Sequence, residues 1–451
     1  MDLSKSFKAY DVRGRIPDEL NPEAVYRIGR AFAEFLKPKR VAVGRDIRHS
    51  SEEFANELIR GLSDSGVDVV DIGLCGTEMV YFATSSLGLD GGVMVTASHN
   101  PPDYNGLKFV REQARPISGD TGLQDIRKLA EAGEFVDAAR RGNSVPFDIK
   151  PSWRDHVLSY IDASKLKPLS IACNGGNGGA GIALDLLEDQ LPFRFTKIHH
   201  EPDGDFPNGV PNPMLEENRE VTGRSVRLSR ADMGIAFDGD FDRCFFFDEE
   251  GRFIDGYYIV GLLASTFLEN NRGAPIVHDP RVVWNTQQIV REKGGRPVQC
   301  RSGHAFMKQG MRDADAIYGG EMSGHHYFRN FAYCDSGMIP WVVMAQHLSR
   351  MGKTLSSLVD ERIKLFPSSG EINRKIGDVQ GAVAAVRSRY QPGSVKIENV
   401  DGLSIEHPRW RFNLRSSNTE PLIRLNVESR GELALMKERT AEILEVLGGF
   451  A

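Results

Sequence analysis

The sequence lacks several features that would mark common classes of protein. Its 451 residues contain five cysteines, an odd number that is widely scattered and includes no Cys-x-x-Cys pair. Neither a disulfide framework nor a zinc site is therefore expected. Basic residues do not outnumber acidic ones, at 56 against 62, and no basic block stands out. This charge pattern argues against a nucleic-acid partner.

Long apolar runs are also missing. The N-terminal segment MDLSKSFKAYDVRGR has no apolar core of the kind that a signal peptide requires, and the longest apolar stretch, 257–268, is too short to cross a bilayer. Together with the unpaired cysteines, these absences predict a cytoplasmic protein with reduced thiols and no membrane partner. We expect a monomer or a weak homo-oligomer.

What is present is an ordinary soluble composition, with 40% hydrophobic and 26% charged residues, in a chain too long for one hydrophobic core. One order of segments recurs three times: an apolar run, a polar loop, a helix-like stretch, and further apolar runs that end in polar loops. The first runs are 40–43, 169–172 and 275–277, and the helix-like stretches are 51–63, 182–188 and 286–292. A further run at 316–318 precedes the loop GGEMSGHH. This repetition predicts three related α/β units.

The tail has a different pattern, since 395–397, 410–414 and 422–427 alternate with period two and a helical stretch follows at 432–447. The fold class is therefore α/β, with three related domains of mixed, largely parallel sheets and a smaller C-terminal α+β domain. Ligands are expected beyond the carboxyl ends of the parallel strands, in a shared central cleft. The predicted domains are 1–144, 145–247, 248–365 and 366–451.

The loop DGDFDR follows an apolar run and carries three carboxylates, Asp238, Asp240 and Asp242. Three hard oxygen donors on one side of an extended segment suggest Mg²⁺ or Ca²⁺, and Arg243 beside them suits a phosphate-bearing ligand. An acidic turn between strands is the plain alternative.

An EF-hand is a second alternative, because these acids and Glu249 fall at positions one, three, five and twelve of its loop. Arg243 stands where that loop needs glycine, and the flanking segments have the pattern of strands.

The loop NGGNGGAG offers a rival function. Gly176, Gly178 and Gly181 match the GxGxxG pattern between a strand and a helix, with Glu201 about twenty residues further on. An NAD-dependent dehydrogenase is therefore an alternative, although no obvious hydride-transfer histidine follows and the glycines also suit a tight turn.

Four further loops carry polar chemistry. In TASHNPPDYNGLK, Ser98 alone is typical of a turn or cap residue, and His99 is not expected to act as its base because adjacent side chains diverge in extended backbone. RSSNTEP supplies donors and one cation suited to phosphate oxygens. GGEMSGHH supplies groups suited to sugar hydroxyls, and His304 in RSGHAF could act as an acid or base.

Five of these motifs, FKAYDVRGR, TASHNPPDYNGLK, DGDFDR, GEMSGHH and RSSNTEP, occur in the order and spacing of the alpha-D-phosphohexomutases. The chain resembles that family over nearly its whole length, and within it the phosphomannomutase and phosphomannomutase/phosphoglucomutase group. The resemblance implies four domains, the last similar to the TATA-binding-protein fold. It also implies a phosphoserine at Ser98, with Mg²⁺ between its phosphate and Asp238, Asp240 and Asp242, and Arg243 nearby.

The same resemblance implies the substrate contacts. Glu321 and Ser323 would hold sugar hydroxyls, and a phosphate-binding loop would hold the phosphate that is not reacting. The loop residues are Arg415, Ser417, Asn418 and Thr419, and Arg424 lies beyond them. Further residues that would line the cleft are Tyr10, Arg13, His99, Lys108, His304 and His325.

Two positions bear on how far the family pattern carries over. Many relatives have lysine where this chain has Arg281, so the substrate-binding role of Arg281 is a separate expectation. Met322 stands where phosphoglucosamine mutases carry glutamine, which favours a hexose without separating mannose from glucose.

The implied reaction interconverts mannose 6-phosphate and mannose 1-phosphate through a hexose 1,6-bisphosphate, for nucleotide-sugar and polysaccharide synthesis such as that of GDP-mannose. His304 and Lys108 are the candidate bases, with Arg13 assisting. His304 is favoured because an ordinary histidine has a pKa near 6.5 and an ordinary lysine one near 10.4. Dual specificity or phosphoglucomutase activity is an alternative. A phosphatase with Asp238 as nucleophile and a non-catalytic sugar-phosphate binding protein are rivals from other classes.

Overall fold

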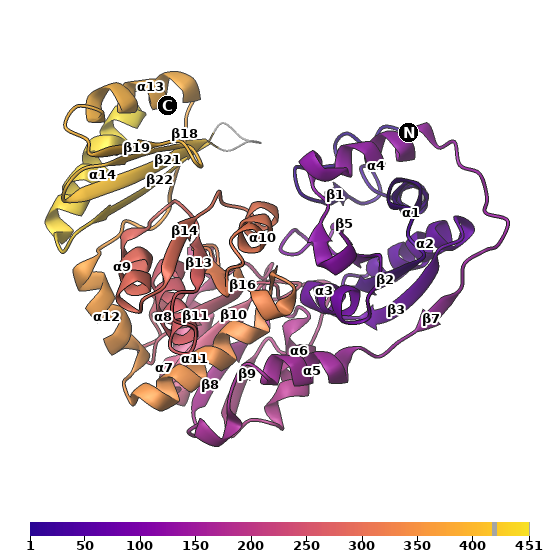
Figure 1. Cartoon of the computed structure of the whole chain (residues 1–451), viewed down its shortest axis with the longest axis horizontal. Helices are drawn as coiled ribbons and strands as arrows, with labels where there is room; N and C mark the ends of the chain where they lie inside the picture. The colour runs from indigo at the N-terminus through magenta and orange to yellow at the C-terminus, as the bar shows by residue number, and fades with distance from the viewer. Residues whose placement is uncertain (417–421, 451) are drawn as a thin grey trace. The chain divides into compact units, whose positions relative to one another are not determined.

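The computed structural model describes residues 1–416 and 422–450, which form two compact units (Figure 1). The first unit consists of Met1–Phe253 and Gly324–Gly352, and the second of Ile254–Ser323 and Lys353–Ala451. The motif loops of the sequence are thus divided between two units.

The first sheet of the first unit has the order β1-β5-β4-β2-β3-β7, with β6 on β5. Its central strands run parallel, and β5 is antiparallel to both β1 and β4. Apolar side chains of α1, α2 and α4 pack on one face of this sheet, while α3 contacts the central strands from the other. The strands are β1 (Val12–Arg15), β2 (Arg40–Arg45), β3 (Asp68–Leu74), β4 (Gly91–Val95), β5 (Tyr104–Arg111), β6 (Arg115–Pro116) and β7 (Ser144–Pro146). The helices are α1 (Pro22–Leu36), α2 (Ser51–Asp64), α3 (Thr77–Ser86) and α4 (Leu123–Ala132).

The second sheet has the order β12-β11-β10-β8-β9. β8 runs parallel to β9 and β10, whereas β10 and β11 form an antiparallel pair joined by DGDFDR. Its strands are β8 (Ser170–Asn174), β9 (Arg194–Ile198), β10 (Met233–Phe237), β11 (Cys244–Phe247) and β12 (Phe253–Ile254), and its helices are α5 (Lys150–Leu158), α6 (Ala180–Glu188) and α7 (Glu220–Ser229).

A buried glutamate joins three helices of the first unit. Glu78 of α3 accepts hydrogen bonds from the amides of Gly337 and Met338 at the start of α11 (Met338–Met351), at 2.7 and 3.3 Å. Its other oxygen accepts from the indole N–H of Trp153 in α5 at 2.9 Å. A carboxylate that receives the first amides of a helix satisfies donors that the helix itself leaves unpaired. Just before α11, β16 (His326–Phe328) pairs antiparallel with β17 (Cys334–Asp335).

The second unit contains a parallel group of strands and an antiparallel sheet. β13 runs parallel to both β14 and β15. The elements of this part are α8 (Gly256–Leu268), β13 (Pro275–His278), α9 (Trp284–Glu292), β14 (Arg296–Gln299), α10 (His304–Asp313), β15 (Tyr318–Gly320) and α12 (Leu355–Leu365).

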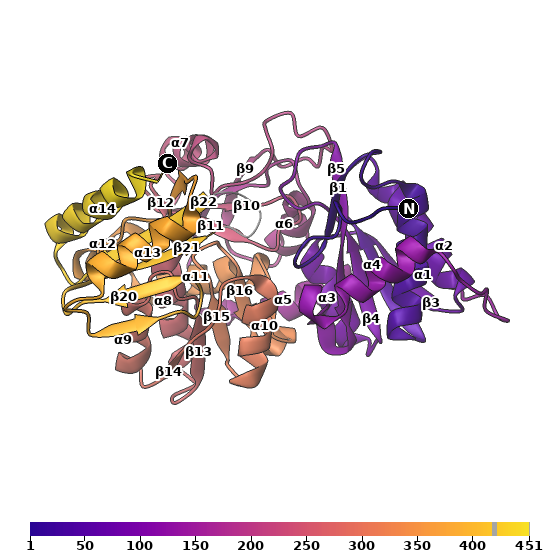
Figure 2. The same cartoon turned by 90° about the horizontal axis from the view of Figure 1, so that it is seen from above.

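The C-terminal sheet has the order β18-β22-β21-β20-β19, all antiparallel. Alternate residues of its strands form an apolar core with α13 and α14, which lie together on one face (Figure 2). The opposite face carries buried polar residues, among them Arg411, Asn426 and Glu428. The elements are β18 (Ile372–Lys375), α13 (Val379–Tyr390), β19 (Lys396–Glu398), β20 (Leu403–Glu406), β21 (Trp410–Ser416), β22 (Leu422–Ser429) and α14 (Leu433–Gly448).

The predicted fold class, largely parallel α/β sheets followed by an antiparallel α+β domain, is confirmed. One predicted strand was misplaced: the run 316–318 enters its strand only at Tyr318, since Asp315 has φ 47° and ends the preceding turn. Among the described residues, no helix combines the length and apolarity that crossing a membrane requires.

Candidate active site

Ser98 lies in a loop whose path is fixed by a buried arginine. After β4 the backbone turns into the left-handed region at Ser98, with φ 49°. The guanidinium of Arg48 donates to the carbonyls of Ser98 and Asn100 at 2.9 and 2.6 Å, and to those of Pro101 and Tyr104 at 2.6 and 2.9 Å. Four carbonyls that converge on one cation hold this loop in a single conformation.

The expectation that the side chains of Ser98 and His99 diverge is wrong. Ser98 Oγ lies 3.0 Å from His99 Nδ1, because the left-handed backbone at Ser98 replaces the extended conformation on which the expectation relied. His99 Nδ1 also receives a hydrogen bond from Arg243. Burial, reinforced by Arg243 and Arg13, holds the pKa of His99 well below its usual value, so its imidazole is neutral.

The three carboxylates of DGDFDR lie together and are buried. Asp238, Asp240 and Asp242 offer oxygens within 4.8 Å of one another, and Ser98 Oγ donates to Asp238 at 2.8 Å. Gly239 permits this approach, because a Cβ there would lie 2.4 Å from the carbonyl oxygen of Ser98. The hairpin of β10 and β11 therefore presents its acids directly to the serine loop.

Two cations partly offset the charge of these three acids. Lys108 of β5 donates to Asp240 and Asp242, at 2.6 Å in each case. Arg243 donates to Asp238 at 2.8 Å. Burial lowers the pKa of Lys108, but Asp240 and Asp242 outweigh it and keep that pKa above its ordinary value. Lys108 is therefore a charged partner of the acids, and this arrangement speaks against its predicted role as a base.

The donor set suits a divalent cation. The residues that could hold it are Asp238, Asp240, Asp242 and an oxygen on Ser98. Asp240 Oδ1 is buried and has no hydrogen-bond partner among the described residues, which leaves a hard oxygen available. Thr77 Oγ1 and Lys108 hold the other oxygen of Asp240, so the free one has a fixed orientation.

Three other predicted residues belong to the first unit. Arg13 of β1 donates to Asn100 at 2.8 Å and is held by Asp11. His325 Nε2 lies 3.8 Å from Asp242 and 4.0 Å from Asp335, so this imidazole borders the acidic cluster. Tyr10 is half-buried in the loop before β1.

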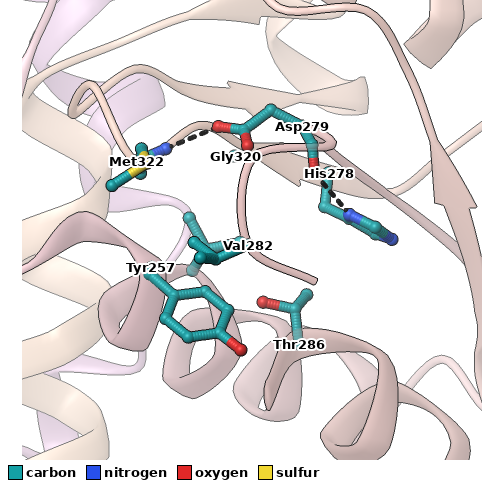
Figure 3. Close-up of a pocket in the computed structure, with 8 residues that line it drawn as sticks. Tyr257, His278, Asp279, Val282, Thr286, Gly320 and Met322 are labelled. Atoms are coloured by element: carbon teal, nitrogen blue, oxygen red, sulfur yellow. Dashed lines mark hydrogen bonds between the residues drawn. The ribbon is translucent and has the colours of Figure 1, made fainter. Parts of the chain in front are cut away.

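In the second unit, Asp279 organises two predicted residues. Its carboxylate accepts from Arg281 at 2.7 and 3.1 Å. It also accepts from the amide of Met322 at 2.8 Å (Figure 3). Asp279 and Met322 border a small cavity of about 10 Å³. Arg281 also lies 3.8 Å from Glu321, which accepts from the amide of Gly303 at 2.8 Å. Asp279 thus fixes both the guanidinium and the backbone of the GEMSGHH loop.

The predicted phosphate-binding arginines meet a glutamate. Arg415 Nη2 donates to Glu371 at 3.0 Å, and Arg424 Nη1 lies 4.0 Å from it. His304, at the first position of α10, and Ser323 are half-buried in this unit. The predicted ligands Ser417, Asn418 and Thr419 lie outside the described residues.

The glycine-rich loop supports the acidic hairpin. Gly179 N donates to the carbonyl of Gly239 at 3.0 Å, and a Cβ on Gly178 would lie 2.6 Å from the same oxygen. Its glycines are therefore explained by close packing. The EF-hand alternative is wrong, because strands β10 and β11 flank the acids where that motif requires helices.

Sequence reasoning missed several residues that organise these sites: Arg48, Asp335, Asp279, Glu371 and Thr77. Arg48 and Asp279 lie in the polar loops GRDIR and HDPR, each directly after a predicted strand, and that position was the available signal. Glu371 follows the break PSSG, and nothing local distinguishes it from a surface acid.

Comparison with known proteins shows the family of the chain. Four models of phosphoglucomutase/phosphomannomutase match the chain: alpha/beta/alpha domain I at residues 4–137, domain II at 151–251, domain III at 255–366, and the C-terminal domain at 371–446. A phosphomannomutase of Escherichia coli is 57% identical over 449 residues, which cover 98% of each chain.

Solved structures are similar as well. A phosphoglucomutase/phosphomannomutase family protein from Burkholderia thailandensis has a TM-score of 0.89 at 31% identity, with 99% of this chain and 98% of that one covered. The N-acetylphosphoglucosamine mutase of Aspergillus fumigatus, solved with GlcNAc-6P and magnesium, shares the fold at 14% identity, with a TM-score of 0.60 over 99% of this chain and 97% of that one. With all four domain models matched and a full-length relative above half identity, the chain belongs to the phosphoglucomutase/phosphomannomutase family.

Proposed function

We propose that the protein is a phosphomannomutase that interconverts mannose 6-phosphate and mannose 1-phosphate with a phosphoryl group carried on Ser98. The observation that carries this proposal is the 2.8 Å hydrogen bond between Ser98 Oγ and Asp238, within a buried cluster of three carboxylates and two cations. The similarity of the chain to a phosphomannomutase over its full length supports mannose as the sugar.

Ser98 has the surroundings of a phosphate carrier. A phosphoryl group on its oxygen would meet Arg243 and Lys108 as cations, and bound Mg²⁺ would offset the charge that develops on the phosphoryl oxygens. In the proposed transfer, a sugar hydroxyl oxygen bonds to phosphorus and the bond from phosphorus to Ser98 Oγ breaks. The hydroxyl proton passes to a base, and the resulting hexose 1,6-bisphosphate then returns its other phosphate to Ser98.

His304 is our proposal for that base. Histidine is a common general base in enzymes, whereas the two carboxylates around Lys108 keep its ammonium charged. Arg13 and His99 are assigned to positioning and charge stabilisation beside Ser98. Tyr10, Glu321, Ser323 and His325 are proposed as sugar contacts, and Arg281, Arg415 and Arg424 with the loop residues Ser417, Asn418 and Thr419 as phosphate contacts.

Dual specificity is the second candidate, because the matched family models cover both phosphoglucomutase and phosphomannomutase. A coupled assay with Mg²⁺, a trace of hexose bisphosphate, and mannose 1-phosphate, glucose 1-phosphate or glucosamine 1-phosphate separates the cases. We expect turnover of mannose 1-phosphate. Equal rates with glucose 1-phosphate would mean a dual enzyme, and activity confined to glucosamine 1-phosphate would contradict both.

Ser98→Ala tests the carrier. Mutase activity should fall by at least about a thousandfold, because the variant lacks the oxygen that would carry the phosphoryl group. The control Ser86→Ala removes a hydroxyl that only donates to a carbonyl within α3, and activity should persist. Phosphate release that is undiminished in Ser98→Ala would instead favour a phosphatase centred on Asp238. Absence of phosphate on Ser98 with no isomer exchange would favour a binding protein.

A further inference from the structure

Glu371 lies among the arginines of the second unit. It directly precedes β18 and is largely buried, with 11% of its side chain exposed. One of its oxygens accepts from Arg415 at 3.0 Å and lies 3.5 Å from Arg281, and the other lies 4.0 Å from Arg424. A single carboxylate thus serves three guanidinium groups that come from separate parts of the chain.

These three arginines are not equally satisfied. Arg281 is held at two nitrogens by Asp279, at 2.7 and 3.1 Å. Arg415 and Arg424 each keep a buried Nε without a hydrogen-bond partner among the described residues. Asp401 accepts from Arg415 as well, at 3.2 Å. Arg415 and Arg424 therefore retain donors that a ligand with several oxygens could use.

We propose that Glu371 is a positioning residue that takes the place of a phosphate group between turnovers, holding Arg415 and Arg424 in place and releasing them to the phosphate of the sugar. The proposal rests on the proposed function, in which these two arginines bind the phosphate that is not reacting.

A phosphate can displace the Glu371 carboxylate from these arginines because it carries more negative charge and more oxygen acceptors. A phosphate monoester carries about two negative charges and three terminal oxygens, whereas a carboxylate carries one charge and two oxygens. Burial raises the pKa of Glu371, but Arg281, Arg415 and Arg424 more than offset this, so the group is an anion in the free protein. Once phosphate binds, Glu371 becomes a like charge beside it.

That repulsion serves turnover. The bisphosphate intermediate must leave the distal site and return with its other phosphate bound there. A nearby carboxylate that can take back the guanidinium groups speeds release at the expense of affinity. Glu371 therefore favours a high kcat over a low KM.

The test compares Glu371→Gln with the wild-type chain. The amide keeps the size and removes the charge, so we expect mannose 1-phosphate to bind about tenfold more tightly in calorimetry, as loss of one nearby like charge predicts. Inorganic phosphate should show the same direction. In the coupled assay KM should fall, and kcat should fall severalfold because release is slower.

Two variants complete the design. Glu371→Asp restores the charge and should return affinity and kcat toward wild-type values. Glu361→Gln removes an exposed carboxylate of the same unit that pairs with Lys353, and both constants should stay unchanged.

Weaker or unchanged binding in Glu371→Gln overturns the proposal, since a purely structural glutamate would leave the arginines less ordered when neutralised. A different result would contradict the proposed function, namely a wild-type chain without mutase activity. In that case the affinities for mannose 1-phosphate and inorganic phosphate would still decide the role of Glu371.

Discussion

At the scale of single residues, the serine loop depends on one buried arginine, Arg48, which also lies 3.4 Å from the carboxylate of Asp46. Arg48 is buried and its four hydrogen bonds all end on carbonyl oxygens between Ser98 and Tyr104. Its contribution is therefore to place Ser98 against Asp238.

Replacing Arg48 with lysine should lower kcat by about tenfold to a hundredfold, because one ammonium cannot reach four carbonyls in a fixed plane. Steady-state kinetics and thermal unfolding of Arg48→Lys would check this. Arg45→Lys, which alters a half-buried arginine paired with exposed Glu52, is the matched control and should retain activity. Equal kcat values for the two variants would show that activity does not require the four hydrogen bonds of Arg48.

His326 should make stability fall in acid. Burial lowers the pKa of this histidine from 6.5 to about 3. As pH falls, the unfolded state therefore binds this proton at a higher pH than the folded state does. The stability that a neutral His326 contributes is complete above pH 6.5 and is lost as pH falls toward 3. Wild type should lose about 2 kcal/mol relative to His326→Gln between pH 6.5 and 5.0.

Urea unfolding of both proteins at the two pH values measures this difference. His49→Gln, which alters a histidine with 69% of its side chain exposed, should follow the wild type. If wild type and His326→Gln lose the same free energy of unfolding between pH 6.5 and 5.0, burial does not lower the pKa of His326.

The limits of sequence reasoning are visible among these residues. Ser98 and the three aspartates could be named because their motifs recur together in one family. Arg48 and Glu371 could not, because their partners are backbone carbonyls and arginines whose positions depend on loop paths that no spacing encodes. The sequence prediction excluded a contact between Ser98 and His99 because it assumed extended backbone, whereas Ser98 has a φ of 49°.

At the scale of elements, two loops approach so closely that only glycine fits. The carbonyl of Ser98 lies above Gly239, and Gly178 packs against the carbonyl of Gly239. The serine loop, the acidic hairpin and the glycine-rich loop therefore form one stack of backbone. Sequence periodicity predicted the strands and helices on either side, but not this stacking, because the glycines resembled a nucleotide-binding fingerprint.

Gly239→Ala should disturb that stack. The new methyl group would lie 2.4 Å from the carbonyl oxygen of Ser98, so the serine must move or the hairpin must shift. We expect a loss of about 1–3 kcal/mol in the free energy of unfolding and a fall in mutase activity of at least about tenfold. Gly448→Ala adds the same methyl group where nothing lies within 4 Å, and both measurements should stay near wild type. An active Gly239→Ala would mean that the stack relaxes freely.

At the scale of the whole molecule, the two faces of the C-terminal sheet have different tasks. One face forms the apolar core with α13 and α14, and the other carries the buried pair of Arg411 and Glu428, joined at 2.8 Å. Arg411 also donates to the carbonyls of Pro280 and Arg281, and Glu428 accepts from the amide of Val283. The sheet is thus docked onto the loop that carries Arg281.

Glu428→Gln should cost about 3–5 kcal/mol in the free energy of unfolding, because it leaves the buried charge of Arg411 uncompensated. Urea unfolding checks the value. Glu442→Gln removes the partner of Arg439 at a more exposed pair and should cost at most about 1 kcal/mol. Similar losses in the two variants would contradict the view that the docked face depends on a buried charge pair.

The order of α/β units and the antiparallel tail could be predicted because hydrophobic periodicity and turn residues repeat along the chain. The division at 144, 247 and 365 stays a prediction. The contacts of Arg411 and Glu428 join segments more than a hundred residues apart, so they cannot be predicted from local composition.

The buried acids beside Ser98 have a consequence for the order in which the centre is loaded. A phosphate on Ser98 brings about two negative charges, and a divalent cation brings two positive ones. Taken up together they leave the net charge of Asp238, Asp240, Asp242 and their cations unchanged, whereas either one alone leaves an unbalanced pair of charges away from water. By thermodynamic reciprocity, each would raise the affinity of the protein for the other, so we expect the protein without phosphate on Ser98 to bind a divalent cation more weakly than the phosphorylated protein.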